Sequence, residues 1–377
     1  MATKKTHKAK ASRGLFRTFT DTVFTAFSAV SVVLLWLCAA SAYVSPDTML
    51  VMSALGLAFP IVLAGTVAVF LLSLLFAPRV CWITLVGMLL CFGSIRSYCP
   101  LNVLRDAHTP SDHAFRVMTY NGCGIKDAAD TVKLDEFLHY LDDQHADIIC
   151  FQEGAYRLRY HSSWPAFFSA AYPYSMSVDS TTCLQIWSRH EILRSETICK
   201  DGANAAVAFW LRHPAGKGEL LVVNTHLKTN YLSVSDRERY KQLVRESSRL
   251  ETSFDNTFHQ SKSILGKVAR AAVIRAKMSD EIADFVGSQP DSLPIIVCGD
   301  FNDTPISYAC QRLKRKGLND AFRMVGNGPG WSFNRDAIAV RIDHQFFTDH
   351  LQPLQAHIDR SATWSDHYPL LVTYEWK

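Results

Sequence analysis

The sequence offers little on which to build a classical zinc site or a cystine framework. Its ten cysteines include no CxxC pair, and no HExxH motif occurs. A zinc site based on either pattern therefore has no support. Cys183 and Cys199 flank an expected hairpin near Glu191, and their spacing allows one disulfide. There is no internal repeat, and the basic N-terminus is the one low-complexity segment.

The C-terminal part of the chain also lacks an excess of positive charge. Residues 1–106 hold nine Lys and Arg against three acids, whereas the remaining 271 residues carry 30 basic and 32 acidic side chains. A domain that binds nucleic acid non-specifically through phosphates is expected to be strongly basic. No such global signal is present here, and the basic run Arg312–Lys316 is more typical of a solvated helix face.

Long uncharged stretches dominate the first hundred residues. Residues 22–46 and 48–78 contain no charged side chain, and each exceeds the roughly 20 residues that cross the hydrocarbon of a bilayer. We predict transmembrane helices at 22–45 and 48–77. A third, at 80–97, contains 16 uncharged residues between Arg79 and Arg96, so it crosses only if those arginines snorkel or the bilayer thins. Two buried helices of a soluble protein are the alternative.

The basic residues around these segments predict the orientation. Six Lys and Arg precede the first span without an acid among them, the first short loop has only Asp47, and the second has Arg79. The positive-inside rule then places residues 1–21 in the cytoplasm, and three spans place the C-terminal domain on the extracytoplasmic side. Ala40-Ser41-Ala42 resembles a signal-peptidase site, and cleavage there would leave the domain on that same side. The side of the domain reverses only if the third segment does not cross.

After a linker at 98–114, residues 115–377 alternate apolar strands with few helices. Arg116–Asn121, a helix from Asp130 and Ala146–Phe151 form an expected βαβ unit. Further strands are expected at the following positions: 184–187, 192–198, 205–211, 220–223, 294–298, 341–348 and 370–376. A helix opening at Ser235 is followed by a polar stretch near Ser253–Ser261 and a second helix. Many strands with few crossover helices indicate an α/β fold of two packed sheets with helices outside.

Six polar clusters lie at or beside the ends of these apolar strands. They are Asn121, Glu153, His226, Asp300 with Asn302, Asp343, and Asp366 with His367. Singly, each has an ordinary structural explanation, such as a turn asparagine or a core histidine. Strand ends are rigid enough to hold catalytic groups, however, and the six occur together.

In these clusters the chain resembles the endonuclease/exonuclease/phosphatase superfamily, whose fold is DNase I-like. The resemblance covers about residues 115–377 and excludes the membrane segment. It is carried by the motifs Thr119-Tyr-Asn121, Phe151-Gln-Glu153, Asn224-Thr-His-Leu227, Gly299-Asp-Phe-Asn302, Arg341-Ile-Asp343 and Ser365-Asp-His367. It implies a four-layer sandwich of two mixed β-sheets and flanking helices, and hydrolysis of phosphoric esters.

The resemblance also implies a divalent-metal site. Glu153 is expected as the main ligand, with Asn121 beside it and Asp366 near the cation or its water. Oxygen-rich ligands of this kind favour Mg²⁺ or Mn²⁺ over Zn²⁺.

The remaining cluster residues are expected to act on the phosphate and the water. By resemblance, Asp300 positions or deprotonates the attacking water, and Asn302 donates to a phosphate oxygen. His367, oriented by Asp343, serves as a base or as a phosphate-stabilising imidazolium, and His226 contacts the phosphate from the other side. Which group takes the proton stays open.

The substrate does not follow from these residues. The order Arg341-Ile-Asp343 disfavours the inositol phosphatases, whose signature places Asp before Arg. Nucleic acid and a phospholipid head group both remain, and the bilayer is the other expected partner, with no obligate protein partner inferred. A catalytically silent, membrane-tethered binding or scaffold module is the alternative function. The presence of Glu153, Asp300 and His367 argues against it.

Overall fold

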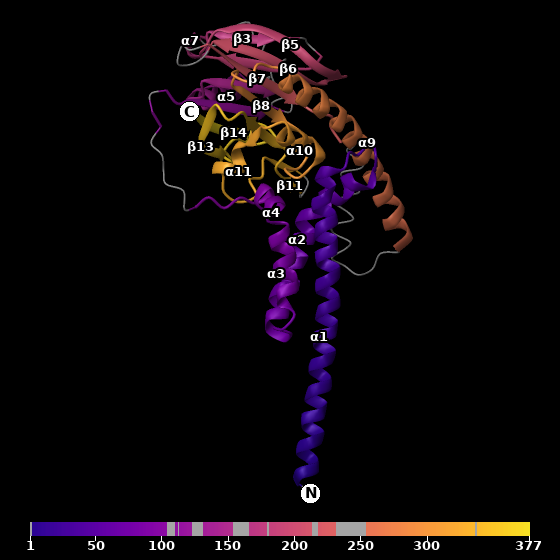
Figure 1. Ribbon diagram of the computed structural model, residues 1–377. Coiled ribbons are helices and arrows are strands. Elements are labelled where there is room, and N and C mark those ends of the chain that lie inside the picture. The colour runs from indigo at the N-terminus through magenta and orange to yellow at the C-terminus, as the bar shows by residue number, and fades with distance from the viewer. Residues whose placement is uncertain are drawn as a thin grey trace.

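The computed structural model shows a helical stem that carries a two-sheet body (Figure 1). The structure describes residues 2–103, 110–111, 113–122, 131–153, 166–178, 181–212, 218–230, 254–335 and 338–377. The N-terminus lies at the far end of the stem, and the C-terminus lies in the body.

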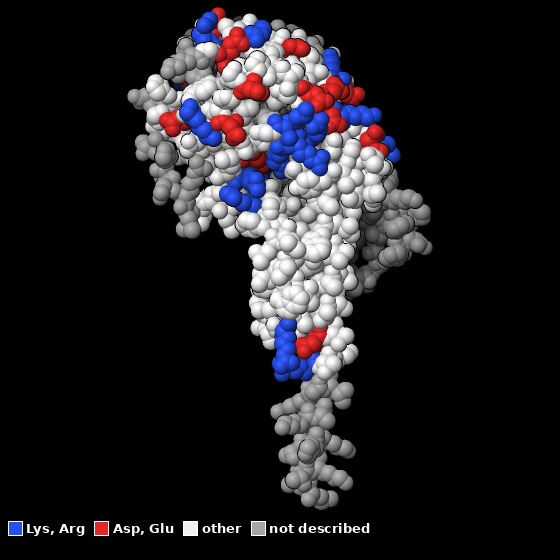
Figure 2. All heavy atoms as spheres, viewed as in Figure 1, with Lys and Arg blue, Asp and Glu red and all other residues white. Residues whose placement is uncertain are grey.

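The stem begins with two long apolar helices. α1 (Ala2–Ala40) continues into a short 3-10 turn, η1 (Ser41–Tyr43), and α2 (Val51–Phe76) runs back along it. The segments Arg17–Tyr43 and Val51–Phe76 are long and apolar enough to cross a membrane. At 1.5 Å per residue the first is about 40 Å long. Figure 2 shows an uncharged stem surface between one group of charged side chains distant from the body and the charged side chains of the body itself.

The third apolar segment differs from the single helix expected at 80–97. It consists of α3 (Cys81–Leu90) and α4 (Phe92–Tyr98), which meet at a bend of 70°. The bend turns α4 toward the body, where the Arg341 guanidinium donates to the carbonyl oxygen of Ser97. α4 thus ends against the body, and the bent pair is either a broken span or a re-entrant loop.

Small residues let the stem helices approach closely. A Cβ atom on Gly87 of α3 would lie 2.4 Å from a methyl group of Val32 in α1, so only glycine fits there. The Trp36 indole donates to the carbonyl oxygen of Gly87 at 3.0 Å. Close packing around small residues, supported by interhelical hydrogen bonds, is how helices associate in a bilayer.

The body contains two six-stranded mixed sheets, as expected from the sequence. The first has the order β13-β14-β1-β2-β4-β3 and the second β5-β6-β7-β8-β12-β9. Within each sheet one central pair is parallel, β1 with β2 and β7 with β8, and the other pairs are antiparallel. The first-sheet strands are β1 (Phe115–Asn121), β2 (Ile148–Gln152), β3 (Tyr174–Ser177), β4 (Gln185–Ser188), β13 (Leu351–Ile358) and β14 (Leu370–Trp376). The second-sheet strands are β5 (Ile192–Asp201), β6 (Asn204–Arg212), β7 (Glu219–His226), β8 (Ile295–Asp300), β9 (Asn319–Asp320) and β12 (Asp343–Phe347).

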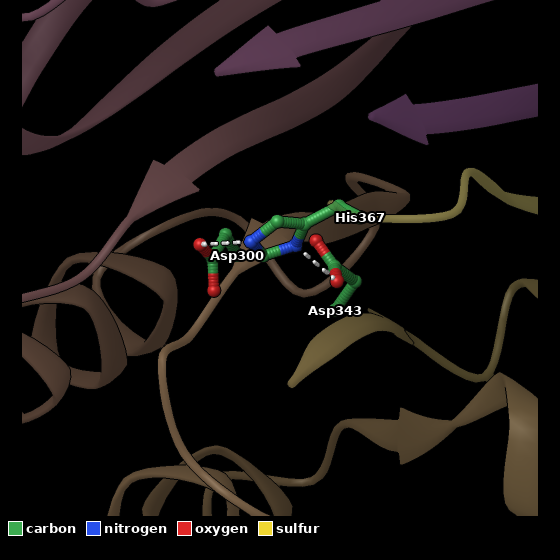
Figure 3. Close-up of side chains that lie close together, drawn as sticks. All are labelled: Asp300, Asp343 and His367. Atoms are coloured by element: carbon green, nitrogen blue, oxygen red, sulfur yellow. Dashed lines mark hydrogen bonds and ion pairs between the residues drawn. The ribbon is translucent and has the colours of Figure 1, made fainter. Parts of the chain in front are cut away.

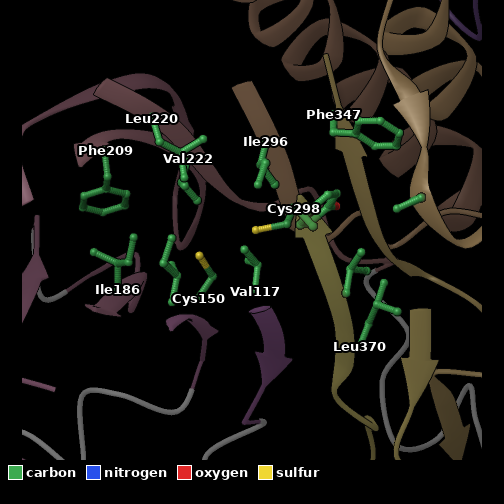
Figure 4. Packing of buried hydrophobic residues seen from close by; sticks show 14 of the residues in the cluster. Val117, Cys150, Ile186, Phe209, Leu220, Val222, Ile296, Cys298, Phe347 and Leu370 are labelled. Carbon is green, nitrogen blue, oxygen red and sulfur yellow. The ribbon is translucent and has the colours of Figure 1, made fainter. Parts of the chain in front are cut away.

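The inner faces of the two sheets form the main core. Val117 and Cys150 of the first sheet face Val222 and Ile296 of the second, all of them buried (Figure 4). Because side chains alternate along a strand, the other face of each sheet must be covered by helices. α5 (Thr131–Asp143) and α7 (Ala166–Ala171) cover the first sheet, and α9 (Phe254–Gly287) and α10 (Tyr308–Arg315) cover the second. The fold is therefore the two-sheet sandwich with outer helices that the strand pattern predicts.

Two details of the sequence interpretation need correction. The polar stretch near Ser253–Ser261 does not separate helices, because α9 already begins at Phe254. Its polar residues precede the packed, amphipathic part of the same helix. Cys199 is a buried free thiol whose Sγ lies 3.9 Å from the carbonyl oxygen of Met278, so the Cys183–Cys199 disulfide is not formed. The helix expected from Ser235 lies outside the described residues.

The body rests directly on the body-side ends of the stem helices. α10 contacts η1, α9 contacts α2, and α11 (Ala321–Val325) contacts α4. Ile306 is buried in one cluster with Leu35, Cys38 and Phe59 of the stem. The start of the linker is also fixed to the body, because Gly328 N donates to Pro100 O at 2.8 Å.

Candidate active site

Four of the expected polar residues meet where the parallel strand pairs end. Asn121 ends β1 and Glu153 follows β2, while His226 and Asp300 end β7 and β8. Parallel neighbours bring their carboxyl ends to one edge of a sheet, and here the two sheets present these edges to each other. The Asn121 amide donates to Asp300 Oδ2 at 2.9 Å and to Glu153 Oε1 at 3.4 Å. His226 Nε2 lies 3.1 Å from Glu153 Oε1.

The backbone at this edge is held in unusual conformations. Glu153 has a φ of 57° and Asn302 a φ of 50°, in the left-handed region that side chains other than glycine seldom adopt. Such residues persist only where the surrounding structure fixes them, and they cluster at functional sites. The strained Glu153 backbone turns its side chain toward the second sheet.

Asp300 occupies the centre of the cluster and is buried. Its Oδ1 accepts from the backbone N–H of Asn302 at 2.7 Å, and its Oδ2 lies 3.8 Å from both His226 Nε2 and His367 Nε2. The Asn302 amide donates to Leu227 O at 3.0 Å and to Asp300 Oδ2 at 3.3 Å. The side-chain amide of Asn302 is thus already engaged in hydrogen bonds within the loop after Asp300. To donate to a phosphate oxygen, it would first have to break these bonds.

Asp343 and His367 form a hydrogen-bonded pair beside Asp300 (Figure 3). Asp343 is the antiparallel register partner of Asp300 on β12, and its Oδ2 lies 2.9 Å from His367 Nδ1. Phe333 of β10 (Phe333–Arg335), which pairs with β11 (Ile338–Val340), packs edge-on against the imidazole with ring centroids 5.0 Å apart. The imidazole is thus aimed with Nδ1 at Asp343 and Nε2 at Asp300.

The loop that carries His367 is tied to β1. The Ser365 hydroxyl donates to the carbonyl oxygen of Asn121 at 2.8 Å and accepts from the His367 backbone N–H at 3.1 Å. One serine therefore connects the imidazole to the strand that positions Asn121.

The electrostatics of the cluster follow from burial and from mutual charge. Burial opposes the charged imidazole of His367, but the carboxylates of Asp343 and Asp300 outweigh it and raise its pKa to about 10. Burial raises the pKa of Asp300 to about 6, with Asp343 adding to the effect and His367 opposing it. Burial would raise the pKa of Glu153, yet the hydrogen bond and charge of His226 lower it. The cluster thus stabilises an imidazolium within a group of carboxylates.

Asp366 has a different environment from the other expected metal ligands. Its Oδ2 forms an ion pair with Arg335 Nη1 at 2.7 Å. The carboxylate is buried whereas Arg335 is partly exposed. The negative charge of Asp366 is therefore balanced by the guanidinium of Arg335 at the rim of the cluster.

The donor set fits a hard divalent cation. Carboxylate oxygens of Glu153 and Asp300 lie within reach of one Asn121 amide, and such oxygens are what Mg²⁺ and Mn²⁺ prefer. Asp300, Asp343 and His367 also form a group whose potential ligand atoms lie within 4.8 Å of one another. Because Nδ1 of His367 is already engaged by Asp343, Glu153, Asn121 and Asp300 are the residues whose oxygens would hold the cation.

A buried polar network beneath the site was not assigned from the sequence. Gln152 Nε2 donates to Asn224 Oδ1 at 2.7 Å, and Asn224 Nδ2 donates to Phe151 O and Gln185 O at 3.0 Å each. These bonds join β7 of the second sheet to β2 and β4 of the first, directly behind Glu153 and His226. The sequence does contain a signal for this network, because Gln152 and Asn224 place amide side chains in otherwise apolar strands, and buried amides need hydrogen-bond partners.

Several solved structures are similar to this chain at low sequence identity. No curated protein matches the chain. Three similar solved structures are zebrafish TDP2 humanized by 14 mutations, the human Nocturnin catalytic domain with bound sulfate, and an endonuclease/exonuclease/phosphatase from Bacteroides vulgatus. In that order, their sequence identities to this chain are 15%, 17% and 17%, and their TM-scores are 0.48, 0.47 and 0.43. The matched regions cover 70%, 71% and 70% of this chain. They cover 100%, 97% and 99% of the three solved chains.

Two family models match the chain. Residues 21–98, the stem, match a domain of unknown function. Residues 118–367 match the Endonuclease/Exonuclease/phosphatase family model, which spans more than half of the chain and includes every member of the cluster. The chain belongs to the Endonuclease/Exonuclease/phosphatase family, whose members are generally phosphoesterases.

Proposed function

We propose that this protein is a membrane-anchored, divalent-metal-dependent hydrolase of phosphodiester bonds. The observation that carries the proposal is the convergence of Asn121, Glu153, His226, Asp300 and the Asp343–His367 pair. These side chains come from positions spread along the whole body, and nothing in the stability of two packed sheets requires them to meet.

The chemistry of a phosphodiester explains the composition of the site. The ester is anionic and resists attack, so the site must supply positive charge and hold a water in line. Mg²⁺ or Mn²⁺, when bound by Glu153 and its neighbours, would supply charge to the phosphate oxygens. Asp300 is close enough to His367 and Asn121 to orient or deprotonate a water between them.

The two histidines would act on the phosphate from either side of Asp300. An imidazolium at His367, supported by Asp343, can donate from Nε2 to a phosphate oxygen or to the leaving oxygen. His226 is held against Glu153 and would contact the phosphate from the opposite side.

The two candidate substrate classes are nucleic acid and the head group of a phospholipid. The body carries no overall excess of basic charge, and the stem holds it close to a bilayer. Purified full-length protein in neutral detergent should be given single-stranded DNA, RNA and sphingomyelin in parallel. Release of nucleotides assigns a nuclease, and release of phosphocholine assigns a phospholipid phosphodiesterase.

Metal-dependent turnover is the decisive test of the hydrolase proposal. Full-length protein should hydrolyse bis-p-nitrophenyl phosphate with Mg²⁺ or Mn²⁺ and stop with EDTA. His367→Ala and Asp300→Asn should nearly abolish turnover, while the surface variant His357→Ala keeps it. Equal activity in the site variants and the parent would remove the assignment. A folded parent that is inactive on every substrate would favour a silent binding module.

We further propose that the N-terminus is cytoplasmic and that the body is extracytoplasmic. The basic residues before the first candidate span support a cytoplasmic N-terminus. The extracytoplasmic body requires in addition that α3 and α4 together form a third span after the two long ones. Alkaline phosphatase, which is active only after export, should be active when fused after Lys377 and inactive when fused after Arg79. The reverse pattern of alkaline phosphatase activity would show that the chain has the opposite orientation.

A further inference from the structure

A pocket of about 190 Å³ lies where the stem meets the body, away from the catalytic cluster. This is far more than the roughly 10–15 Å³ that one water needs on the same measure, so the pocket can admit a phosphate group. Its walls come from η1 and α4 of the stem and from α10 and α11 of the body. The polar side chains on the walls are those of Tyr43, Ser94, Ser97, Gln311, Lys314 and Arg323.

The two charged residues of the pocket are both cations. Lys314 Nζ donates to Pro305 O at 3.2 Å, which uses one of the three hydrogens of an ammonium group. Burial lowers the pKa of Lys314, and a bound anion would oppose that effect by stabilising the charged form. Arg323 Nε is buried and has no hydrogen-bond partner among the described residues. Among the residues that the structure describes, no aspartate or glutamate lines this pocket.

The surroundings add further positive charge. Arg341 is buried beneath the pocket and donates to Ser97 O, while its Nε and Nη1 have no hydrogen-bond partner in the described part of the chain. Arg315 donates to Tyr43 O at 3.3 Å and lies over the Tyr43 ring. Asp320 is the acid that interacts with Lys314 and Arg341. Lys and Arg side chains gather over α10, just above the uncharged stem (Figure 2).

The position of the pocket selects the kind of anion. η1 closes the apolar segment Arg17–Tyr43, and α4 ends the third apolar segment, so the pocket opens at the body-side end of the proposed membrane spans. Lipid phosphates lie at this level, and basic residues next to a bilayer bind anionic lipids. We propose that this pocket binds the phosphate head group of an anionic phospholipid from the leaflet adjacent to the catalytic body.

Binding there would join the two parts of the molecule. A phosphate held by Lys314 and Arg323 would contact α10 and α11 of the body, while the acyl chains of its lipid would pack beside α1 and α3 of the stem. A ligand that binds only the folded arrangement stabilises it by mass action. The site is separate from the catalytic cluster, so an inactive chain would bind the lipid equally well.

The first experiment uses the wild-type chain alone. Full-length protein in neutral detergent is titrated with phosphatidylglycerol, with phosphatidylcholine, and with the soluble anions inorganic phosphate and glycerol phosphate. We expect phosphatidylglycerol to remain bound in native mass spectra and to raise Tm, with phosphatidylcholine and both soluble anions at least tenfold weaker. Equal binding of both lipids overturns the proposal, and so does binding of free phosphate as tight as that of the lipid.

The second experiment separates the pocket from general surface charge. Lys314→Gln/Arg323→Gln removes both cations of the pocket. Arg312→Gln/Lys316→Gln removes two charges from the same basic run but outside the pocket, where they pair with Asp280 and Asp284. At roughly 1 kcal/mol for each basic residue, we expect the pocket variant to bind phosphatidylglycerol about 30-fold more weakly and the control about as the parent.

Equal weakening in both double variants would show attraction to the basic surface only and would overturn the pocket. Circular dichroism and turnover of bis-p-nitrophenyl phosphate report whether each variant is folded. If the double variant is unfolded, the single variant Arg323→Gln takes its place. Retained binding by a folded Arg323→Gln chain counts against the proposal.

Discussion

His367 Nδ1 lies 2.9 Å from Asp343 Oδ2, and the same imidazole presents Nε2 to Asp300 Oδ2 at 3.8 Å. One ring is thus held between two buried carboxylates that are register partners on β8 and β12. Each carboxylate favours the protonated ring, and Asp343 also fixes its orientation. The geometry assigns different tasks to two acids that the sequence places 43 positions apart.

Asp343→Asn separates the charge of this carboxylate from its shape. An asparagine can still accept from Nδ1–H through its carbonyl oxygen, but it no longer stabilises the imidazolium. We expect kcat on bis-p-nitrophenyl phosphate to fall about 100-fold or more and the pKa of His367 to drop toward its ordinary value. Kinetics and histidine NMR titration measure the two effects. Asp349→Asn, the same change in the β12–β13 turn, should leave both unchanged. An unaltered His367 pKa in Asp343→Asn would contradict this account.

Glu153→Gln tests the cation site. The amide keeps the size of the side chain and removes its charge, so the metal loses an anionic ligand. We expect the Mg²⁺ or Mn²⁺ concentration for half-maximal activity to rise more than tenfold, with part of the turnover regained at saturating metal. Calorimetric titration of the metal should show the same weakening. Glu191→Gln, at a surface ion pair with Arg212, is the matched control. Unchanged metal affinity would place the cation elsewhere.

The apolar strands and their polar ends were predictable because local pattern decides them. β1, β2, β7 and β8 are continuous buried runs, and each delivers a polar residue where the run stops. Burial on both faces leaves few ways to arrange such strands other than in packed sheets. The fold class and the candidate residues at the strand ends therefore followed from the sequence.

Contacts between distant elements were not predictable in this way. The pairing of Asp366 with Arg335 depends on a short hairpin without clear alternation, and the 70° bend after α3 depends on Arg341 capturing α4. α9 already begins at Phe254, inside a polar stretch that the sequence interpretation placed between two helices. In the first two cases a partner far away in the sequence takes part in the local structure.

His344 makes stability depend on pH. Burial, followed by the charge of Arg341, lowers the pKa of this histidine to about 4, and its Nε2 lies 3.0 Å from Asp303 O. In the unfolded chain the ordinary value is near 6.5, so between pH 6.5 and 4 the unfolded state binds the extra proton. The neutral side chain therefore contributes stability that is present above pH 6.5 and is lost as the pH falls toward 4.

The size of this loss follows from the two pKa values. From pH 7 to pH 5 the contribution of His344 should fall by about 2 kcal/mol. His344→Gln, which can still donate to Asp303 O, should be less stable than the parent at pH 7 but lose less stability on acidification. Thermal melting of the full-length protein across this range measures the slope. Exposed His357→Gln should keep the parental slope. Equal slopes in the parent and His344→Gln would show that another group controls the acid response.

Gly299 affects both the packing of β8 against β7 and the position of the catalytic candidate Asp300. Its φ is 140°, and a Cβ there would lie 1.9 Å from the backbone oxygen of Thr225, its register partner on β7. Gly299→Ala must therefore push β8 away from β7. We expect a loss of more than about 3 kcal/mol, or roughly 6 to 12 °C in Tm. Gly202→Ala, at a positive φ with open space around it, should cost about 1 kcal/mol.

Because Asp300 follows Gly299 directly, any folded Gly299→Ala protein should also lose the 2.9 Å contact between Asp300 and Asn121, and with it most of its turnover. A stable and fully active Gly299→Ala chain would show that β8 can move without disturbing the site.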